Sequence, residues 1–170
     1  MRRITTSGRG QTRVLNDLLQ NLLVTELLVP SKQLWVLSPW ISDIVVIDNS
    51  AGQFKTVLPG LPSRRIRLTE VLIELTRRGS DVRVLMRDVQ ANDVARQRLE
   101  DPNSVGARPT VTIHNNLHDK GIVGDRFHIQ GSMNFTYFGQ AVNDEGVIVT
   151  SEPHEIAQAR IAYNSKYDVS

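Results

Sequence analysis

The chain has 170 residues, of which 40% are apolar and 22% are charged, and its formal net charge is only +2. These values fit one globular domain over residues 1–170, and no segment has the ~18 apolar residues of a membrane span. The absence of cysteine excludes thiolate chemistry, disulfides and cysteine zinc sites. The basic N-terminus lacks the apolar core of a signal peptide, so we expect a cytoplasmic protein.

Arginine dominates the basic residues, with sixteen Arg against four Lys. Seven of the arginines lie between Arg64 and Arg87, against three acids in the same stretch, and a second basic group lies within residues 2–13. Because Arg makes bidentate contacts with phosphate, two interpretations stay open. The stretch is either an ordinary solvated surface or a track for a polyanion such as nucleic acid.

Helical and extended patterns alternate in the first part of the chain. Leucines at helical spacing predict a helix over residues 12–29, which stops at Pro30. An apolar run predicts a buried strand over residues 33–38. Residues 41–65 place a short apolar run among Asp, Asn, Ser, Gly and Pro, which predicts an irregular excursion over the surface, with room for a small hairpin.

The remaining pattern predicts an α/β fold. An amphipathic helix is expected over residues 67–78, with Gly79 as its C-terminal cap. Further expected elements are strands over 81–86, 111–113, 117–123, 127–131 and 145–150, a polar helix capped by Asn92 and ending near Glu100, a loop over 102–109, a turn or short helix over 134–140, and a helix over 153–167. Short loops between the later strands favour antiparallel pairing, so we expect a mixed sheet with helices on both faces.

Two short segments carry four polar groups at strand spacing. His118 and Lys120 are two residues apart, and so are Ser132 and Asn134. Residues i and i+2 of a strand share a face, so the four groups converge if the two strands are neighbours. A nucleophile or proton carrier, a cation and two neutral hydrogen-bonding groups suit a phosphate ester better than any other common substrate.

The segment that contains these groups resembles the phospholipase D superfamily. The family pattern is His-x-Lys-x4-Asp, then Gly-Ser-x-Asn, then a later acidic residue. The matching positions are His118, Lys120, Asp125, residues 131–134 and Glu145. The gap between the two halves of the pattern is slightly shorter than in its commonest version.

Two further stretches agree with this resemblance. Residues 78–85 are similar to the "RG-x-DVRVL" step of the family, and Ser38-Pro39-Trp40 looks like its first strand running into the active-site mouth. Ser38 and Trp40 are therefore possible substrate contacts, and Trp40 could stack on a base. Residues 41–65 depart from the small-nuclease pattern. Within the family, the chain looks most like the phospholipase D-like protein (DpdK type) of bacterial clusters that place 7-deazaguanines in DNA.

The resemblance implies a phosphodiesterase that needs neither a metal nor another cofactor. His118 would attack phosphorus and form a phosphohistidine, and a neutral imidazole with a reference pKa of ~6.5 is a competent nucleophile. Lys120, Ser132 and Asn134 would hold the non-bridging oxygens. Glu145 would accept a hydrogen bond from the other ring nitrogen of a histidine and orient it.

The leaving oxygen also needs a proton, which the family takes from a histidine in a second motif. This chain carries one motif, so the resemblance implies a homodimer in which two copies of His118 face each other, one attacking and one protonating. Asp125 is expected to fix the turn between strands, and Asp119 to take no part in catalysis. His114 and His118 have a zinc-like spacing but lack the Glu of a zincin motif, so we expect no metal site.

Three functions fit these expectations. The first is a DNA endonuclease of a modification or restriction system, with DNA and other subunits of that system as partners. The second is a phospholipid-hydrolysing enzyme, which ranks lower because no segment reads as an interfacial helix. The third is a dimeric subunit that binds DNA or protein with little catalysis.

Overall fold

The computed structural model describes residues 2–6, 9–101, 108–132 and 145–167. Its elements are β1 (Arg2–Thr6), α1 (Arg9–Leu28), β2 (Gln33–Leu37), β3 (Val45–Asp48), β4 (Arg65–Arg67), α2 (Leu68–Arg77), β5 (Asp81–Met86), the 3₁₀ turn η1 (Gln90–Asn92), α3 (Asp93–Leu99), β6 (Thr110–Ile113), β7 (Gly121–Val123), β8 (His128–Gly131), β9 (Glu145–Thr150) and α4 (Pro153–Tyr167).

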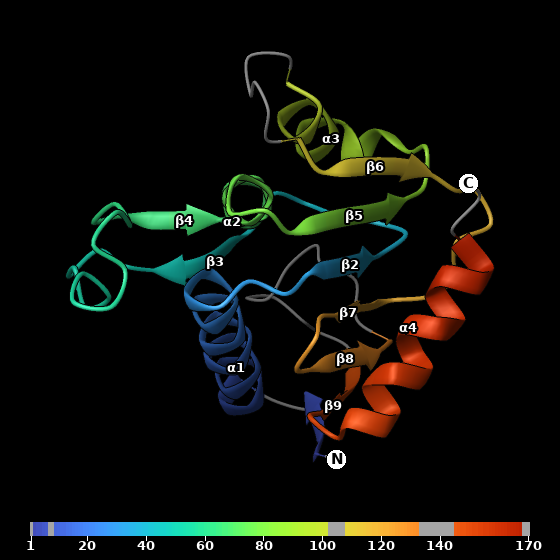
Figure 1. Cartoon of the computed structure of the whole chain (residues 1–170), viewed down its shortest axis with the longest axis horizontal. Helices are drawn as coiled ribbons and strands as arrows, with labels where there is room; N and C mark the ends of the chain where they lie inside the picture. The colour runs from blue at the N-terminus through green and yellow to red at the C-terminus, as the bar shows by residue number, and fades with distance from the viewer. Residues whose placement is uncertain (1, 7–8, 102–107, 133–144, 168–170) are drawn as a thin grey trace.

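A seven-stranded mixed sheet runs through the fold in the order β1-β9-β8-β7-β2-β5-β6 (Figure 1). Strands β2, β5 and β6 are parallel, whereas β7, β8, β9 and β1 continue from β2 in antiparallel pairs. The expected mixed sheet is therefore confirmed. Strand β6 joins the parallel half because α3 forms a crossover between β5 and β6, as parallel neighbours require.

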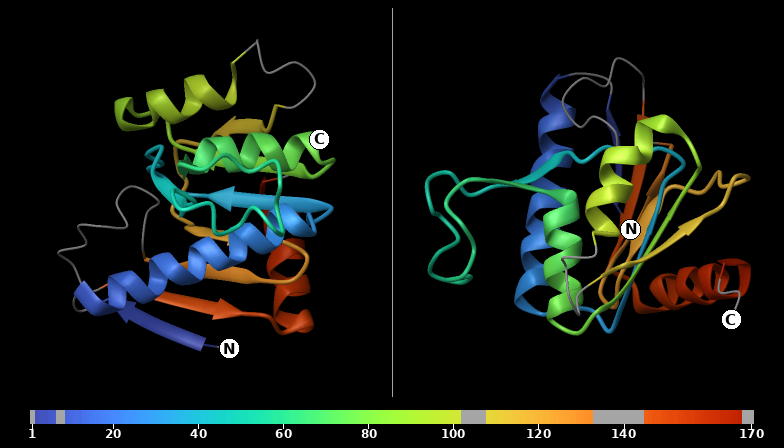
Figure 2. Two further views of the ribbon diagram at one scale, coloured as in Figure 1. Left: turned by 90° about the vertical axis from the view of Figure 1, so that its left-hand side faces the viewer. Right: turned by 90° about the horizontal axis from the view of Figure 1, so that it is seen from above.

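Helices cover both faces of the sheet, as predicted (Figure 2). Leu34 and Val36 of β2 belong to a large core that includes residues of α1, α2 and α3. Trp35 and Leu37, which alternate with them, lie in a smaller core with Ile156 and other residues of α4. This alternation is the period of a strand that is buried on both sides. Among the described helices, none is long and apolar enough to cross a membrane.

The helices follow the predicted boundaries closely. The pattern over residues 12–29 corresponds to α1, and the pattern over 153–167 corresponds to α4. Helix α2 ends as expected, since Gly79 has a φ of 91° and its N–H donates to the carbonyl of Thr76 at 3.0 Å. A left-handed residue at this position favours glycine, which has no Cβ to clash.

Two strands differ from the sequence-based expectation. Strand β1 had no sequence signal, yet its backbone pairs with β9 from Arg2↔Val149 to Thr6↔Glu145. Strand β7 begins at Gly121 rather than at residue 117. The reason is a turn just before it, in which the N–H of Leu117 donates to the carbonyl of His114 at 2.9 Å. His118 and Lys120 therefore lie in the segment that leads into β7.

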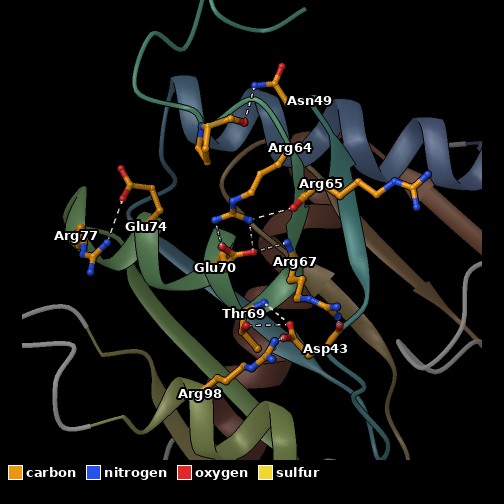
Figure 3. A network of polar contacts seen from close by, with 11 residues as sticks. Asp43, Asn49, Arg64, Arg65, Arg67, Thr69, Glu70, Glu74, Arg77 and Arg98 are labelled. Atoms are coloured by element: carbon orange, nitrogen blue, oxygen red, sulfur yellow. Dashed lines mark hydrogen bonds and ion pairs between the residues drawn. The ribbon is translucent and has the colours of Figure 1, made fainter. Parts of the chain in front are cut away.

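Residues 41–65 form the expected excursion, and β3 pairs with β4 as its hairpin stem. The buried side chain of Asn49 holds the intervening turns together. Its Nδ2 donates to the carbonyl of Pro62 at 2.9 Å (Figure 3), and its Oδ1 accepts from the N–H of Phe54 at 3.1 Å. Leu58 belongs to the large core. The excursion is thus packed against the body of the protein.

The arginine-rich stretch over residues 64–87 is built largely into local ion pairs (Figure 3). Arg64 pairs with Glu70, and Arg67 donates to the backbone carbonyl of Asp43 at 2.6 Å. The other members also have partners: Arg65 with Asp48, Arg77 and Arg78 with Glu74, Arg83 with Asp81, and Arg87 with the carbonyl of Leu117. Because each guanidinium already has a partner, the stretch gives little support to a continuous polyanion track.

Asn92 does not cap α3 with its side chain, contrary to the sequence-based prediction. Its side chain instead forms hydrogen bonds with three backbone groups outside α3, and only 2% of the residue is exposed. Its Oδ1 accepts from the N–H of Ile41 at 2.7 Å, and its Nδ2 donates to the carbonyls of Pro39 and Arg87 at 2.9 and 2.8 Å. Asn92 therefore joins the chain after β2 to the chain after β5.

We expect Asn92→Ala to lower the free energy of unfolding by about 2–4 kcal/mol, because it leaves buried backbone groups without partners. Gln90→Ala changes an exposed residue of the same turn and serves as the control, with an expected effect within about 0.5 kcal/mol. Urea unfolding measures both variants. Equal, small effects in the two variants would contradict the joining role of Asn92.

Candidate active site

A pocket of about 390 Å³ lies where the segment before β7 meets β8, β9 and α4. Its lining residues are His118, Asp119, Lys120, Gln130, Gly131, Gly146, Ile148 and Tyr163. The structure thus brings the predicted imidazole and ammonium groups to one cavity. It also places the start of the Gly-Ser pair, Gly131, on the wall of that cavity.

His118 is exposed and lies beside an arginine that the sequence analysis did not assign to the site. The Nη2 atom of Arg87 is 3.1 Å from Nδ1 of His118, and its Nε donates to the carbonyl of Leu117 at 2.8 Å. The guanidinium carbon also lies 5.2 Å from the ring centre of Trp40. Arg87 therefore links the histidine to the tryptophan that was predicted as a substrate contact.

Lys120 is half-buried, and its side chain contacts the backbone of His118. Its Nζ donates to the carbonyl of His118 at 3.1 Å, and its own carbonyl accepts from the N–H of Gly131 at 3.3 Å. An ammonium has three N–H groups. Since one of them is used for His118, the others can serve an anion in the pocket.

Ser132 follows β8 directly and is held against β9. Its hydroxyl accepts from the N–H of Gly146 at 3.1 Å, and its N–H donates to the carbonyl of the same residue at 3.1 Å. A Cβ at Gly131 would lie only 2.1 Å from the Gly146 carbonyl oxygen. Only glycine therefore allows β8 and β9 to approach so closely beside the pocket.

Two predicted residues are not placed by the structure. Asn134 lies outside the described residues. Glu145 is described as the first residue of β9 in its backbone, but its side chain lies outside the described part of the chain. The contributions of both to the site remain predictions from the family resemblance.

Asp125 anchors the turn between β7 and β8. One carboxylate oxygen accepts from the N–H of Lys32 at 2.7 Å, and the other pairs with Arg160 of α4. Its N–H donates to the hydroxyl of Ser31 at 2.8 Å. These contacts tie the turn to the connection between α1 and β2 and to α4, as a structural residue would.

Asp119 lines the pocket, but its carboxylate is bound to α4. Burial alone would raise the pKa of Asp119, yet hydrogen bonds from Lys166 at 2.8 Å and Tyr167 at 2.6 Å outweigh burial and lower it. The same contact with Asp119 raises the pKa of Lys166. The carboxylate therefore stays ionised and helps to fix α4 beside the pocket.

The two residues after β2 that were predicted as substrate contacts differ in their surroundings. Trp40 is 36% exposed and lies beneath Arg87, so its ring can reach a substrate. Ser38 is fully buried, and its hydroxyl donates to the carbonyl of Trp40 at 2.7 Å. The prediction of a direct contact through Ser38 is therefore corrected, because the side chain supports the loop that carries Trp40.

Tyr163 of α4 also lines the pocket and was missed by the sequence analysis. Burial raises the pKa of its hydroxyl to about 12, and this hydroxyl lies 3.3 Å from Nε2 of His128. Burial lowers the pKa of His128. Both groups are therefore neutral around pH 7. Within the described ranges, no group of three or more potential metal ligands is found.

The position of Arg87 in the sequence could have predicted its place at the site, whereas nothing in the sequence predicted the place of Tyr163. Arg87 follows directly on the predicted strand over residues 81–86, and in α/β folds ligands bind beyond the carboxyl ends of parallel strands. Tyr163 belongs to a helix whose sequence alone does not reveal which strand it covers. Only the assembled fold places its ring at the pocket.

Residues 44–165 match the family described as "Cardiolipin synthase, PLD-like domain", whereas no curated protein matches the sequence significantly. Solved structures with a similar fold include Nuc, a phospholipase D family member from Salmonella typhimurium, at 16% identity and a TM-score of 0.60, covering 98% of this chain and 93% of that chain. NucT from Helicobacter pylori has 11% identity and a TM-score of 0.56, covering 98% and 96%. The archaeal chromatin protein TrmBL2 has 12% identity and a TM-score of 0.54, covering 99% of this chain and 52% of that chain.

At these identities the solved structures show a common fold, while the family match extends over more than half of the sequence. The match includes the segment around the pocket, and the mixed sheet with helices on both faces agrees with it. The predicted superfamily is therefore confirmed: the chain belongs to the phospholipase D-like family described as cardiolipin synthase, PLD-like domain.

Proposed function

We propose that this protein is a metal-independent phosphodiesterase that cleaves DNA through a phosphohistidine at His118. The observation that carries the proposal is that the exposed imidazole of His118 and the ammonium-bearing Lys120 line one pocket, together with Gly131, the residue before Ser132. A nucleophile beside a fixed cation is the minimum that in-line substitution at phosphorus requires.

The proposed reaction has two steps. In the first, a ring nitrogen of His118 forms a bond to phosphorus while the bond from phosphorus to the leaving oxygen breaks, and that oxygen takes a proton from a second, doubly protonated imidazole. In the second, water forms a bond to phosphorus while the bond from phosphorus to the His118 nitrogen breaks, and the water gives its proton to the same second imidazole, which is now neutral. Lys120, Ser132 and Asn134 would stabilise the charge on the non-bridging oxygens, and Glu145 would orient a ring.

The second imidazole is proposed to be His118 of another copy of this chain. The described pocket offers few other acids: Tyr163 has a pKa raised to about 12, which makes it a poor proton donor around pH 7. A two-fold contact that brings the pockets of two copies together would supply both histidines from one sequence. The protein would then act as a homodimer.

DNA is the proposed substrate class, for two reasons. Trp40 is exposed beside Arg87, which suits stacking on a base next to a bound phosphate. The fold also occurs in TrmBL2, whose structure is described as showing a novel mode of DNA binding. The sequence resemblance further suggests a modification or restriction system, with other subunits of that system as partners.

Loss of the nucleophile tests the proposed chemistry. We expect His118→Ala to lower the rate of DNA cleavage in EDTA by about 1,000-fold or more, and Lys120→Met by about 100-fold or more. His154→Ala changes an exposed histidine in the first turn of α4 and serves as the control, with wild-type cleavage expected. Modified and unmodified plasmid DNA are the substrates. A His118→Ala protein that cuts both as fast as the wild type would rule out this mechanism.

Mixed dimers test whether two copies share one site. If each site needs His118 from both copies, equal amounts of wild-type and His118→Ala chains, unfolded and refolded together, should retain about one quarter of the activity of the same total amount of wild-type protein. If each chain works alone, about one half should remain. Gel filtration of the same samples checks that dimers form. The value of one half would refute the shared site.

A phospholipid substrate is the second candidate, because the matching family is described by the name of cardiolipin synthase. The same pocket could hold a lipid phosphodiester, since the groups that bind the phosphate would be unchanged. Vesicles that contain phosphatidylglycerol or cardiolipin distinguish the two candidates. Hydrolysis of these lipids without cleavage of DNA would make the lipid the substrate.

A further inference from the structure

Arg87 is held firmly in place beside His118. Its backbone N–H donates to the carbonyl of Pro39 at 3.3 Å, and its own carbonyl accepts from Nδ2 of Asn92 at 2.8 Å. Its side chain donates to the carbonyl of Leu117, lies over the ring of Trp40 and reaches Nδ1 of His118 at 3.1 Å. The contact with the imidazole therefore comes from a guanidinium that is fixed on several sides.

This contact determines which nitrogen of His118 carries the proton. A guanidinium is always charged and can only donate hydrogen bonds, so Nδ1 must be the acceptor. A neutral imidazole has one N–H, which must then be on Nε2. Among the groups that the structure describes, none bonds Nε2, so this nitrogen is the one left for a substrate.

An Nε2 that carries a proton cannot attack phosphorus, because its lone pair belongs to the aromatic ring. The neutral ring is also a very weak acid, because loss of its one proton would leave an imidazolate anion, so only the doubly protonated ring donates a proton around pH 7. We infer that Arg87 is a positioning residue that holds His118 in a resting tautomer, and that His118 must lose this contact before it can attack phosphorus or take up the second proton that makes it a donor. The inference rests on the proposed function for its catalytic meaning. The tautomer itself is a property of the free protein.

The role proposed for Glu145 requires the opposite protonation state of Nδ1. A carboxylate that orients the ring must accept a hydrogen bond from Nδ1–H, whereas Arg87 needs Nδ1 without a proton. The two partners therefore exclude each other at one atom. Contact with Arg87 defines the resting ring. Contact with Glu145 allows the nucleophile, in which Nε2 has no proton, or the proton donor, in which Nε2 carries one.

Acylation by diethyl pyrocarbonate tests the inference without any substrate, because only a ring nitrogen without a proton can attack this electrophilic reagent. In the wild-type protein that nitrogen is Nδ1, which Arg87 occupies. We expect His118 to be acylated about tenfold or more slowly than the exposed His154, which serves as an internal reference. Peptide mass spectrometry of the full chain measures both rates in one sample.

Arg87→Met should bring the two rates to within about threefold, and Arg87→Lys, which keeps a donor, should lie between Arg87→Met and the wild type. The matched control is Arg83→Met, since Arg83 lies on β5, the strand that Arg87 follows, and its guanidinium pairs with Asp81 and lies 5.1 Å from the ring centre of Trp35. It should leave the slow rate unchanged.

Two results would overturn the inference. One is a wild-type His118 that reacts as fast as His154. The other is a slow rate that persists in Arg87→Met, which would mean that burial against another copy protects the ring. Neither result depends on DNA cleavage. Failure of the inference is therefore distinguishable from failure of the proposed function.

Discussion

The close backbone approach of β7, β8 and β9 is the constraint on which the pocket depends. A Cβ at Gly131 would lie 2.1 Å from the carbonyl oxygen of Gly146, and a Cβ at Gly121 would lie 2.4 Å from that of Ile129. Side chains at these positions would push the strands apart, so the wall of the pocket is made partly of bare backbone. His118 and Lys120 immediately precede Gly121, and Ser132 immediately follows Gly131. The glycines therefore position the polar groups on both sides of them.

The spacing of the motif has a structural explanation in the short strand β7. Lys120 directly precedes this strand, and Asp125 lies in the turn beyond its end. Asp125 is bound to the connection between α1 and β2 and to α4, so the far end of β7 is fixed to two other parts of the fold. The four residues between Lys120 and Asp125 are the three residues of β7 and Gly124. The distance in sequence thus sets the position of the histidine relative to an anchored turn.

The local sequence pattern correctly predicted elements that form because of their own residues, such as the buried strand β5 and the helix α4. The sequence also predicted that His118 and Lys120 lie together. It missed features whose cause lies elsewhere in the chain. Strand β1 exists through pairing with β9, and the side chain of Asn92 bonds carbonyls after β2 and β5 instead of its own helix. Ser38 lies in a segment that resembles the active-site mouth of the family, but its side chain is buried and does not line the pocket. Such outcomes depend on contacts between distant segments, which a single sequence does not reveal.

A site built from two identical chains has to obtain two different roles from one histidine. In the proposed mechanism, His118 attacks in one copy and donates a proton in the other, so its role cannot be determined by its sequence surroundings alone. Both roles require Nδ1 to carry a proton and therefore to leave Arg87, after which the two rings differ in whether Nε2 is also protonated. A bound phosphodiester has two unequal ends, so its orientation decides which copy of His118 faces phosphorus as the nucleophile and which faces the leaving oxygen as the acid. The asymmetry then comes from the substrate, and either copy can take either role in successive reactions.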